Sequence, residues 1–595
     1  MAKATRGYRI GRWLPAVGWL RSYQKEHLGG DVIAGTVVAI MLVPQAMAYA
    51  MLAGLPAQVG LYASILPLVL YALLGSSKTL AVGPVAIVSL LVANAIAEAG
   101  VADVVTAMMM ALTLAAMSGI LLIALGIARL GFLVNFISHP VISGFTSGAA
   151  VVIGASQLKA VLGFSIPRSA NIFETLSYAA SHLSATNFVT LAIGLSAVAL
   201  LLCWPRLIDV ALKNTRLASS LRAALGRAGP LVAVLIGTLV VTGFSLNTRA
   251  AVEIVGAIPR GLPAIALPMF DLEVWRALLG PALLVVFVGF MESVAVAKTL
   301  ASKRRQKIDP NQELIALGAA NLGAGATGGY PVTGGFSRSV VNFTAGANTQ
   351  LAAMITAGWI LMTVILLTPL FYFLPRAVLA AVILVAVSTL IDVRALTKAW
   401  RYNKADAVAL SVTFGIVLIL GVEAGILTGM AISIALYLLR TSRPHIAVVG
   451  RVADTEHFRN IERHRVRTVP TILAIRVDES LYFANTRFLE DYLLAAVADA
   501  DEVEHVVLIM SAVNFVDMSA LESLETLMDE LRDAGVTVHL AEVKGPVMDQ
   551  FERSDLLEHL APGRVFLSTH DAIEALSLAE ARVESTATTG EIGSS

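Results

Sequence analysis

The chain has 595 residues, of which 57% are hydrophobic and 14% are charged. Soluble domains average about 25% charged residues, so this composition favours a membrane protein. The formal net charge of +1 excludes the basic excess that is typical of nucleic-acid-binding proteins. The one cysteine, Cys203, lies in an apolar run, where we expect a small, buried side chain.

Residues 1–30 predict a basic, partly amphipathic arm on the inner membrane face. About thirty residues precede the first long apolar stretch, whereas a cleavable signal would place a short apolar core much nearer the start. The arm contains six basic residues: Lys3, Arg6, Arg9, Arg12, Arg21 and Lys25.

Apolar runs of spanning length recur as far as about Arg443. A helix needs roughly 20 apolar residues to cross a bilayer. Clear candidates are 31–52, 105–127, 132–155, 185–204, 228–245, 278–297, 351–373, 376–391, 405–421 and 424–440. Shorter or Gly/Pro-broken stretches lie at 56–75, 79–98, 311–326 and 329–347. We therefore predict an α-helical polytopic transmembrane domain at 31–440 with 14 segments, although hydropathy alone supports any number from ten to fourteen.

The distribution of basic residues predicts the orientation. With the N-terminus inside and fourteen alternating elements, 24 Lys and Arg residues fall on the inner side. The outer loops hold six: Lys159, Arg168, Arg249, Arg260, Arg276 and Arg376. This asymmetry follows the positive-inside rule, so we expect both termini in the cytoplasm of a multi-pass protein of the cell's inner membrane.

Two Gly/Pro-containing breaks occupy matching places in the two halves of this domain. Residues 79–84 (Thr-Leu-Ala-Val-Gly-Pro) and 330–335 (Tyr-Pro-Val-Thr-Gly-Gly) each lie about fifty residues after the start of a long span. Such breaks indicate an inverted-repeat transporter, here with repeats of about 31–246 and 277–440. Each break would precede a half-helix with free N-terminal amides, and two facing ends would bind an anion. Ordinary turns between short helices are the alternative.

Charged residues inside the predicted spans mark candidate functional positions. Arg338 is the one basic residue that this topology places within a membrane element, at a cost of about 3 kcal/mol on insertion scales. We expect it to bind an anion together with Ser337, unless it forms a salt bridge with Glu292. We interpret Glu292 as a proton-coupling carboxylate whose protonation neutralises charge on the anion's route. Glu423, beside two glycines, is interpreted as structural.

The first span contains polar residues next to a helix-breaking residue. Pro44 interrupts the backbone ladder and can expose backbone groups to a site. Gln45 and Tyr49 follow it and could line the pocket, or could equally serve in packing between helices.

Three motifs stand out in the sequence: Pro44 to Tyr62 (PQAMAYAMLAGLPAQVGLY), Val82-Gly-Pro84, and Tyr330 to Asn342 (YPVTGGFSRSVVN). Together they resemble the sulfate permease (SulP) family, which includes prestin. The resemblance implies a 7+7 inverted repeat divided into core and gate domains, a homodimer, and an elevator-like movement of the core. It also implies that the anion lies among Gln45, Tyr49, Val85, Ala86, Glu292, Ser337 and Arg338.

The eighth segment guides the expected substrate. Family members that carry bicarbonate with sodium tend to have an aspartate–threonine arrangement there, whereas this chain has Glu292-Ser293. The pair resembles proton-coupled sulfate permeases, although some dicarboxylate carriers share it. We therefore expect proton-coupled sulfate uptake by alternating access. The alternatives are a bicarbonate/chloride or dicarboxylate exchanger, a channel-like conductor, and an anion sensor.

Residues 446–581 alternate short apolar strands with amphipathic helices, which predicts a cytoplasmic α/β domain. It resembles the STAS domain through Asn514-Phe-Val-Asp-Met-Ser-Ala-Leu521, and such a domain implies a cytoplasmic regulatory partner. Ser519 matches the phosphorylation loop of related proteins and could be a regulatory phosphoserine, or it could cap a helix. Residues 582–595 predict a disordered tail.

The sequence contains no zinc-ligand spacing, P-loop or nucleophile elbow. We therefore expect no enzymatic activity, no cofactor and no metal. The expected partners are the transported anion (sulfate), protons, membrane lipid and a second copy of the chain.

Overall fold

The computed structural model describes residues 14–578, except 102, 137, 168–170, 214–224, 260, 264 and 501. The chain divides into two compact units, Met1–Ser433 and Ile434–Ser595. The predicted tail (582–595) and the first thirteen residues of the predicted arm lie outside the described residues. So do Arg168 and Arg260 of the predicted outer loops.

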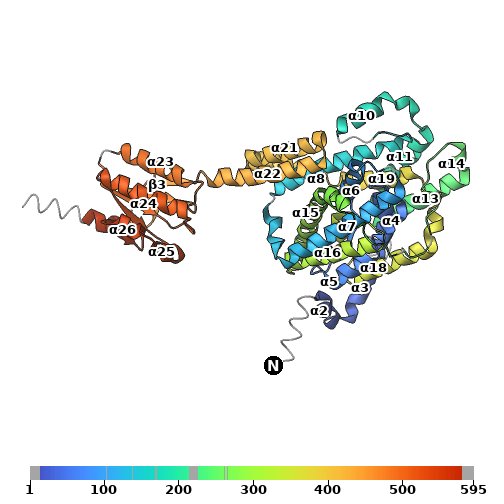
Figure 1. The fold of residues 1–595 in the computed structure, drawn as a ribbon, viewed down its shortest axis with the longest axis horizontal. Helices are drawn as coiled ribbons and strands as arrows, with labels where there is room; N and C mark the ends of the chain where they lie inside the picture. The colour runs from blue at the N-terminus through green and yellow to red at the C-terminus, as the bar shows by residue number, and fades with distance from the viewer. Residues whose placement is uncertain are drawn as a thin grey trace, which may run out of the picture. The chain divides into compact units, whose positions relative to one another are not determined.

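The first unit is helical, and most of its longer helices are labelled in Figure 1. Its N-terminal half contains α2 (Pro15–Arg21), α3 (Lys25–Leu52), α4 (Ala57–Tyr62), α5 (Leu66–Leu74), β1 (Val82–Gly83), α6 (Ala86–Glu98), α7 (Val104–Ile127), α8 (His139–Ser156), α9 (Leu158–Leu162), α10 (Ile172–Ser181), α11 (Phe188–Ala211), α13 (Gly229–Phe244) and α14 (Leu246–Arg249). Its C-terminal half contains α15 (Leu272–Lys303), α16 (Pro310–Ala326), β2 (Thr333–Gly334), α17 (Phe336–Thr344), α18 (Leu351–Met362), α19 (Arg376–Ser388), α20 (Val393–Tyr402), α21 (Lys404–Leu420) and α22 (Val422–Thr441), which continues into the second unit.

Helix lengths agree with a membrane protein. Among the described residues, nine helical segments are long and apolar enough to span a bilayer. Shorter helices, namely α6, α13, α16, α17 and α21, occupy the five other predicted elements. The first span begins at Lys25, so the last six residues of the predicted arm belong to α3. The number of true crossings stays a prediction.

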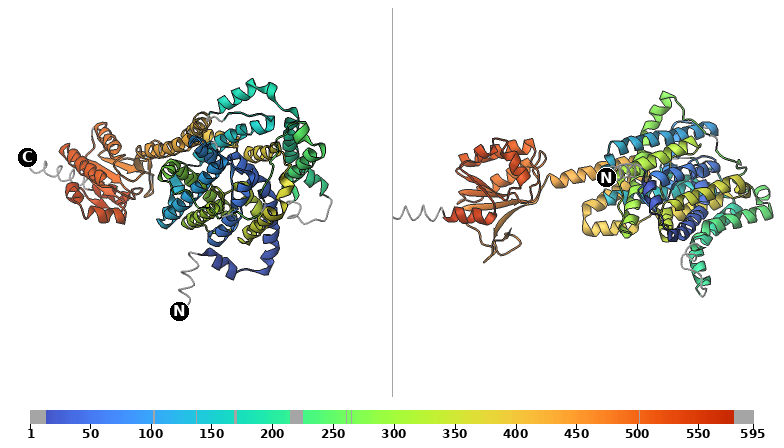
Figure 2. Two further views of the ribbon diagram at one scale, coloured as in Figure 1. Left: turned by 45° about the vertical axis from the view of Figure 1, so that its right-hand side comes forward. Right: turned by 90° about the horizontal axis from the view of Figure 1, so that it is seen from below.

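Helix packing divides the membrane-type helices into two groups. In one group, α16 packs on α7 and α5, α18 on α3, and α15 on α7 and α6. In the other, α21 packs on α8, and α11 packs on α19 and α13. Further contacts join α3 to α19 and α13. The division into core and gate stays a prediction, and Figure 2 shows the bundle from two further sides.

Glycines allow α7 and α16 to pack closely against each other. A Cβ on Gly119 of α7 would lie 2.8 Å from the carbonyl oxygen of Gly318. Equally, a Cβ on Gly318 of α16 would lie 2.8 Å from the oxygen of Gly119. Small residues let helix backbones approach in this way inside membranes, where apolar side chains gain little from leaving lipid.

A buried carboxylate joins α16 to the chain that leads into the first break. Glu313 is fully buried and accepts four hydrogen bonds from three residues. The donors are the Tyr71 hydroxyl (2.7 Å), the Ser76 amide and hydroxyl (2.8 and 2.7 Å), and the Ser77 amide (3.0 Å). Asp31 likewise joins α3 to the chain after α17. Its carboxylate accepts from the backbone amides of Asn348 and Thr349.

Replacing Glu313 with Gln is expected to destabilise the protein by about 2 kcal/mol. An amide nitrogen cannot accept from Tyr71 or from the serine amides, so at least one buried donor loses its partner. Thermal unfolding of the purified full-length chain would show a lower apparent Tm. Glu273→Gln, at an exposed position on α15, is the matched control. An unchanged Tm for Glu313→Gln would contradict this role.

The prediction that Cys203 is buried is wrong, because its side chain is exposed. It lies on α11 beside Leu202, which is also exposed. Leu195, about two turns earlier on the same helix, is exposed as well. This outward apolar face is expected for a helix at the edge of a membrane bundle, where lipid would cover it.

The second unit contains a six-stranded sheet, ordered β4-β3-β5-β6-β7-β8. The strands are β3 (Ile446–Arg451), β4 (Phe458–Asn460), β5 (Ile472–Val477), β6 (His505–Ile509), β7 (Thr537–Ala541) and β8 (Val565–Phe566). The helices are α23 (Thr486–Ala498), α24 (Met518–Asp533), α25 (Gly545–Phe551), α26 (Leu556–Leu560) and a last helix at 569–578. Strands β5 to β8 are parallel, whereas β3 pairs antiparallel with β4 and β5.

Helices cover both faces of this sheet. One core cluster joins the sheet to α23–α26, and a second joins its other face to the helix at 569–578. The predicted α/β domain is therefore confirmed. The expectation that Ser519 caps a helix is wrong, because the Asp517 side chain caps α24 by accepting from the Ala520 amide at 2.8 Å. Ser519 lies one residue inside the helix, on its exposed side.

Candidate anion site

The two predicted breaks meet inside the first unit. Strand β1 pairs antiparallel with β2, with Val82 opposite Gly334 and Gly83 opposite Thr333. Each strand leads directly into a helix: α6 begins at Ala86 after its N-cap Val85, and α17 begins at Phe336. The first amides of a helix have no intrahelical acceptor, so two positive helix ends lie beside one crossing. The predicted breaks and helix starts are confirmed.

Glycines at the crossing leave room for a large cation. Gly83 has φ +151°, a conformation that other residues rarely adopt. A Cβ on Gly335 would lie 2.9 Å from Nη2 of Arg338. Larger side chains at these positions would displace the guanidinium.

Arg338 lies between the two helix starts and is 2% exposed. Its Nη1 donates to the carbonyl oxygen of Pro84 at 2.5 Å, which joins α17 to the residue before α6. Its Nε and Nη2 are buried and have no hydrogen-bond partner among the described residues. Buried N–H groups of a cation that have no protein acceptor are suited to bind an anionic ligand.

Glu292 lies on α15 and also faces this region. Its Oε2 is buried and has no hydrogen-bond partner in the described part of the chain. No ion pair joins Glu292 to Arg338 among the described residues, so the salt-bridge alternative is not formed here. Glu292 and Arg338 are therefore each free to interact with a bound ion or proton rather than with each other.

One cavity of about 50 Å³ brings the predicted residues together. All seven predicted residues line it: Gln45, Tyr49, Val85, Ala86, Glu292, Ser337 and Arg338. The remaining lining residues are Ile87, Gly335, Phe336, Ala386, Val387, Thr389 and Leu390. The contribution from the end of α19 was missed, because an apolar run without charges gives no sequence signal for it.

Gln45 and Tyr49 lie on α3, 4% and 7% exposed. The expected break at Pro44 does not end the helix, because α3 continues through it from Lys25 to Leu52. Tertiary packing holds the helical conformation on both sides of the proline, as is common in membrane helices. Gln45 and Tyr49 therefore reach the cavity from a continuous helix.

A hydroxyl network behind the cavity was also missed. Ser293 of α15 donates to the Gly289 oxygen at 2.6 Å, lies 2.6 Å from the Thr333 hydroxyl, and accepts from the Gly334 amide at 2.8 Å. Thr333 also donates to Gly289 at 2.5 Å. The network fixes β2 on the helix that carries Glu292. A serine next to an intramembrane acid was the available signal.

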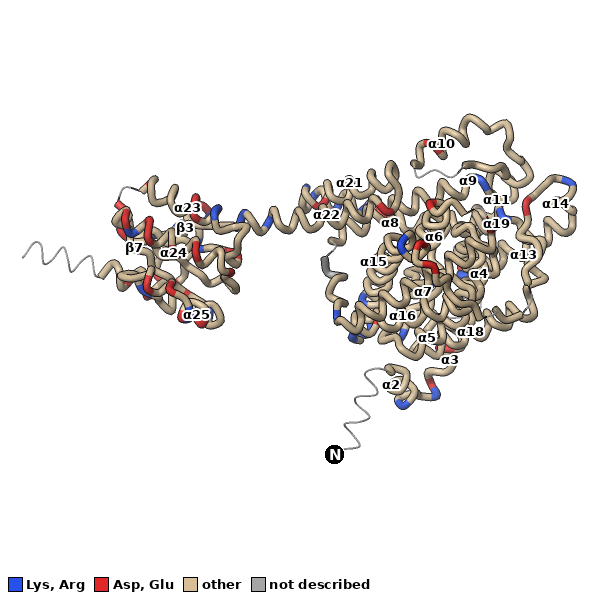
Figure 3. The backbone as a smooth tube through the Cα atoms, in the orientation of Figure 1, with Lys and Arg blue, Asp and Glu red and all other residues tan. Residues whose placement is uncertain are grey.

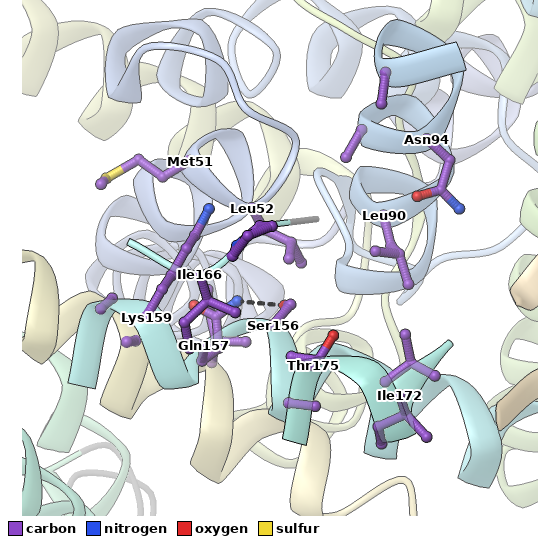
Figure 4. Close-up of a pocket in the computed structure, with 18 of the residues that line it drawn as sticks. Met51, Leu52, Leu90, Asn94, Ser156, Gln157, Lys159, Ile166, Ile172 and Thr175 are labelled. Carbon is purple, nitrogen blue, oxygen red and sulfur yellow. Dashed lines mark hydrogen bonds between the residues drawn. The ribbon is translucent and has the colours of Figure 1, made fainter. Parts of the chain in front are cut away.

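A second, larger cavity of about 620 Å³ reaches the other ends of α3 and α6. Figure 4 shows Met51 and Leu52 of α3, Leu90 and Asn94 of α6, and Gln157 and Lys159 around it. Arg376 at the start of α19 also lines it and pairs with Glu253 at 3.0 Å. Glu423 lines this cavity rather than the small one, after a turn at Gly421 with φ +92°.

Both cavities are lined by α3, α6 and α19, at different levels. Along α19, Leu379, Ala380 and Ile383 line the larger cavity, whereas Ala386 and Val387 line the smaller one. In Figure 3 charged residues are sparse along the helices of this unit and frequent in the second unit. These features define a multi-pass membrane protein with an anion-type site at two crossed, broken helices.

Comparisons with known proteins agree with this class. Residues 28–413 match the model of the sulfate permease family, and residues 463–572 match the STAS domain. A probable sulfate transporter 4.2 of Arabidopsis thaliana is 37% identical over 94% of this chain and 83% of its own. A probable sulfate transporter of Mycobacterium tuberculosis is 34% identical over 95% of this chain and 98% of its own.

Solved structures show the same fold. The overall structure of SLC26A9 superposes with a TM-score of 0.87 at 26% identity, and it covers 98% of this chain and 95% of its own. The transmembrane domain of a cyanobacterium bicarbonate transporter, BicA, gives a TM-score of 0.57 at 24% identity over 69% of this chain. The chain belongs to the sulfate permease family and carries a C-terminal STAS domain. It is a membrane anion transporter and not an enzyme.

Proposed function

We propose that this protein is a secondary active transporter that takes up sulfate with protons, by an elevator-type alternating-access mechanism. The observation that carries the proposal is Arg338, a buried cation whose Nε and Nη2 have no partner among the described residues. The proposed anion ligands are Arg338, Ser337, Gln45, Tyr49 and the helix start at Val85 and Ala86. The two relatives described above are named as probable sulfate transporters, which supports sulfate as the anion.

The site chemistry suits a small oxyanion. A guanidinium presents its N–H groups in a fork that matches oxyanion geometry. The N-termini of α6 and α17 add partial positive charge and backbone amide donors, and they do so without a further charged side chain. Ser337 is exposed at the cavity and can supply a hydroxyl donor. A dianion bound here would satisfy donors that otherwise stay buried and unpaired, which favours occupancy.

Glu292 is the proposed proton-coupling residue. A carboxylate beside a dianion repels it by about 8 kcal/mol at 4 Å and an effective dielectric constant of about 20, which is twice the value for two unit charges. A proton on Glu292 removes that repulsion and supplies a hydroxyl donor, so proton and dianion binding favour each other. Coupled uptake is the consequence, because the empty and the doubly loaded site are then the favoured states.

The two cavities support alternating access. Because α3, α6 and α19 line both cavities, movement of α3 and α6 along α19 would exchange the cavity from which the anion site is reached. The division of the packing contacts into two helix groups supports a rigid core that moves against a gate. We propose fourteen segments in a 7+7 arrangement, a homodimer, and cytoplasmic termini in the cell's inner membrane.

The STAS domain is the proposed contact for a cytoplasmic regulatory partner. Ser519 is exposed near the start of α24, where a phosphate would lie at the positive end of the helix. A regulatory phosphoserine at this position stays a prediction.

Radiolabelled sulfate uptake into proteoliposomes tests the proposal. Uptake is expected to increase several-fold when the outside is more acidic than the lumen, and to fall when unlabelled sulfate competes. Chloride, bicarbonate and succinate are the comparison anions. No sulfate uptake under any gradient, with bicarbonate or succinate accepted instead, would overturn the substrate. Equal uptake with and without the pH gradient would overturn proton coupling alone.

A further inference from the structure

A third cavity, lined mainly by basic residues, lies in the STAS domain, remote in sequence from the transport site. It has a volume of about 380 Å³ and seven lining residues: His445, Arg459, Asn460, Arg463, His464, Arg476 and Asp478. Three of these are arginines and one is an acid, so the lining carries a net charge of +2 with both histidines neutral. Every lining residue is polar, which is unusual for a cavity that serves only packing.

The one acid in this cavity is already engaged. Asp478 accepts from Arg476 Nε at 2.6 Å and Nη2 at 3.0 Å, and its Oδ2 lies 2.9 Å from His445 Nδ1. Burial raises the pKa of Asp478, but the hydrogen bonds from Arg476 and His445 outweigh it and hold the pKa below its ordinary value. Asp478 therefore remains a carboxylate at neutral pH and fixes Arg476 and His445 at the cavity wall.

A hydrogen-bonded turn after β4 supplies other residues of the lining. Asn460 is 8% exposed, and its side-chain oxygen accepts from the Glu462 amide at 2.7 Å. Its backbone oxygen accepts from the amides of Arg463 at 3.2 Å and His464 at 3.1 Å. The turn therefore holds these two residues at the cavity. Among the interactions of the described residues, the Arg463 and His464 side chains have no hydrogen bond or ion pair.

We propose that this cavity, the STAS basic pocket, binds a tetrahedral oxyanion, as a phosphate group or sulfate. The Arg463 guanidinium is free to donate, and Arg459 uses only Nη1, which donates to the Phe458 oxygen at 3.2 Å. Arg476 and His445 also line the pocket. Arginine forks favour oxyanions because they offer parallel N–H donors. The proposal does not depend on which anion the membrane domain transports.

Two sources could supply this group. His445 follows the last residue of α22, Thr441, by four residues, which limits their separation to about 14 Å of extended chain. Basic residues this near the cytoplasmic end of a spanning helix favour anionic lipid headgroups. A free phosphate or sulfate ion offers the same oxygens, and its binding would report the cytoplasmic oxyanion level to the transporter.

Hydrogen–deuterium exchange on the full-length protein in nanodiscs tests the proposal. One arm uses phosphatidylcholine nanodiscs titrated with inorganic phosphate or sulfate. The other arm compares phosphatidylcholine nanodiscs with nanodiscs that also contain phosphatidylglycerol, without free oxyanion. Peptides covering 458–467 and 472–478 are expected to exchange more slowly in at least one arm, which identifies the source.

Paired variants make the readout specific. The double variant Arg459→Gln with Arg463→Gln removes two cations from the pocket. We expect it to lower the apparent affinity for the oxyanion, as read from the exchange protection, by about tenfold. Arg465→Gln with Arg467→Gln removes the same charge from exposed neighbours that do not line the pocket, and should leave protection unchanged. All four residues are exposed, and unchanged exchange across β6 and β7 would confirm that the variants are folded.

The proposal is overturned if neither arm slows exchange in these peptides. It is also overturned if both double variants reduce protection equally, because that would indicate non-specific charge attraction. These outcomes are independent of sulfate uptake, so they do not test the proposed transport function.

Discussion

Replacing Arg338 with Gln is expected to lower sulfate uptake by about a hundredfold. Charge-assisted hydrogen bonds contribute about 1.5–3 kcal/mol each, and loss of roughly 3 kcal/mol of anion binding corresponds to about a hundredfold. The Nε and Nη2 groups without partners are the donors that would be lost. Initial rates of radiolabelled uptake across a range of sulfate concentrations would show the loss in kcat/KM.

Two controls separate the charge of Arg338 from its shape and from folding. Arg338→Lys keeps the charge but not the forked donors, so an intermediate loss is expected. Arg305→Gln removes an exposed cation just after α15 and should leave uptake unchanged. Because Arg338 also donates to Pro84, size-exclusion profiles and apparent Tm must be compared. Uptake by folded Arg338→Gln within twofold of the native rate would contradict the assignment.

Replacing Glu292 with Gln is expected to abolish the pH dependence of uptake. Native uptake should rise as the outer pH falls, because a proton on Glu292 removes a negative charge beside the dianion. Glutamine imitates the protonated acid in shape and charge, so the variant should transport at a rate that no longer follows the pH gradient. Uptake measured at several outer pH values with a fixed lumen would show a flat profile.

Glu423 offers a matched control for this experiment. Its Oε1 is also buried without a partner among the described residues, but it lies at the larger cavity. Glu423→Gln should therefore keep the native pH profile. A Glu292→Gln profile that still rises toward acid would remove Glu292 from the coupling mechanism, whatever its effect on the absolute rate.

Much of the site was predictable because its residues break local rules. A charged side chain in an apolar run is costly, so Arg338 and Glu292 are conspicuous in the sequence. Proline and glycine interrupt helices through their own backbone chemistry, so the breaks before Val85 and Phe336 are visible as well. The same local reasoning failed at Pro44, where packing of the surrounding helices holds α3 continuous.

The incorrect predictions for Ser519 and Cys203 also arose because local sequence does not specify tertiary packing. A serine after a strand is a good helix cap, but Asp517 occupies that position, and only the observed start of α24 distinguishes them. An apolar neighbourhood predicts burial for Cys203, but the outward side of α11 depends on where its neighbours pack. Neither choice is encoded within a short window of sequence.

The sequence by itself determined the membrane class and the position of both breaks, because composition and backbone chemistry act locally. Its resemblance to the sulfate permease family supplied the set of seven predicted site residues. Only the tertiary structure decided that β1 pairs with β2, that Arg338 keeps Nε and Nη2 without partners among the described residues, and that the end of α19 closes the cavity. It also decided that Arg459, Arg463 and Arg476 line one pocket. These features join residues far apart in the chain, and they depend on packing that no local pattern specifies.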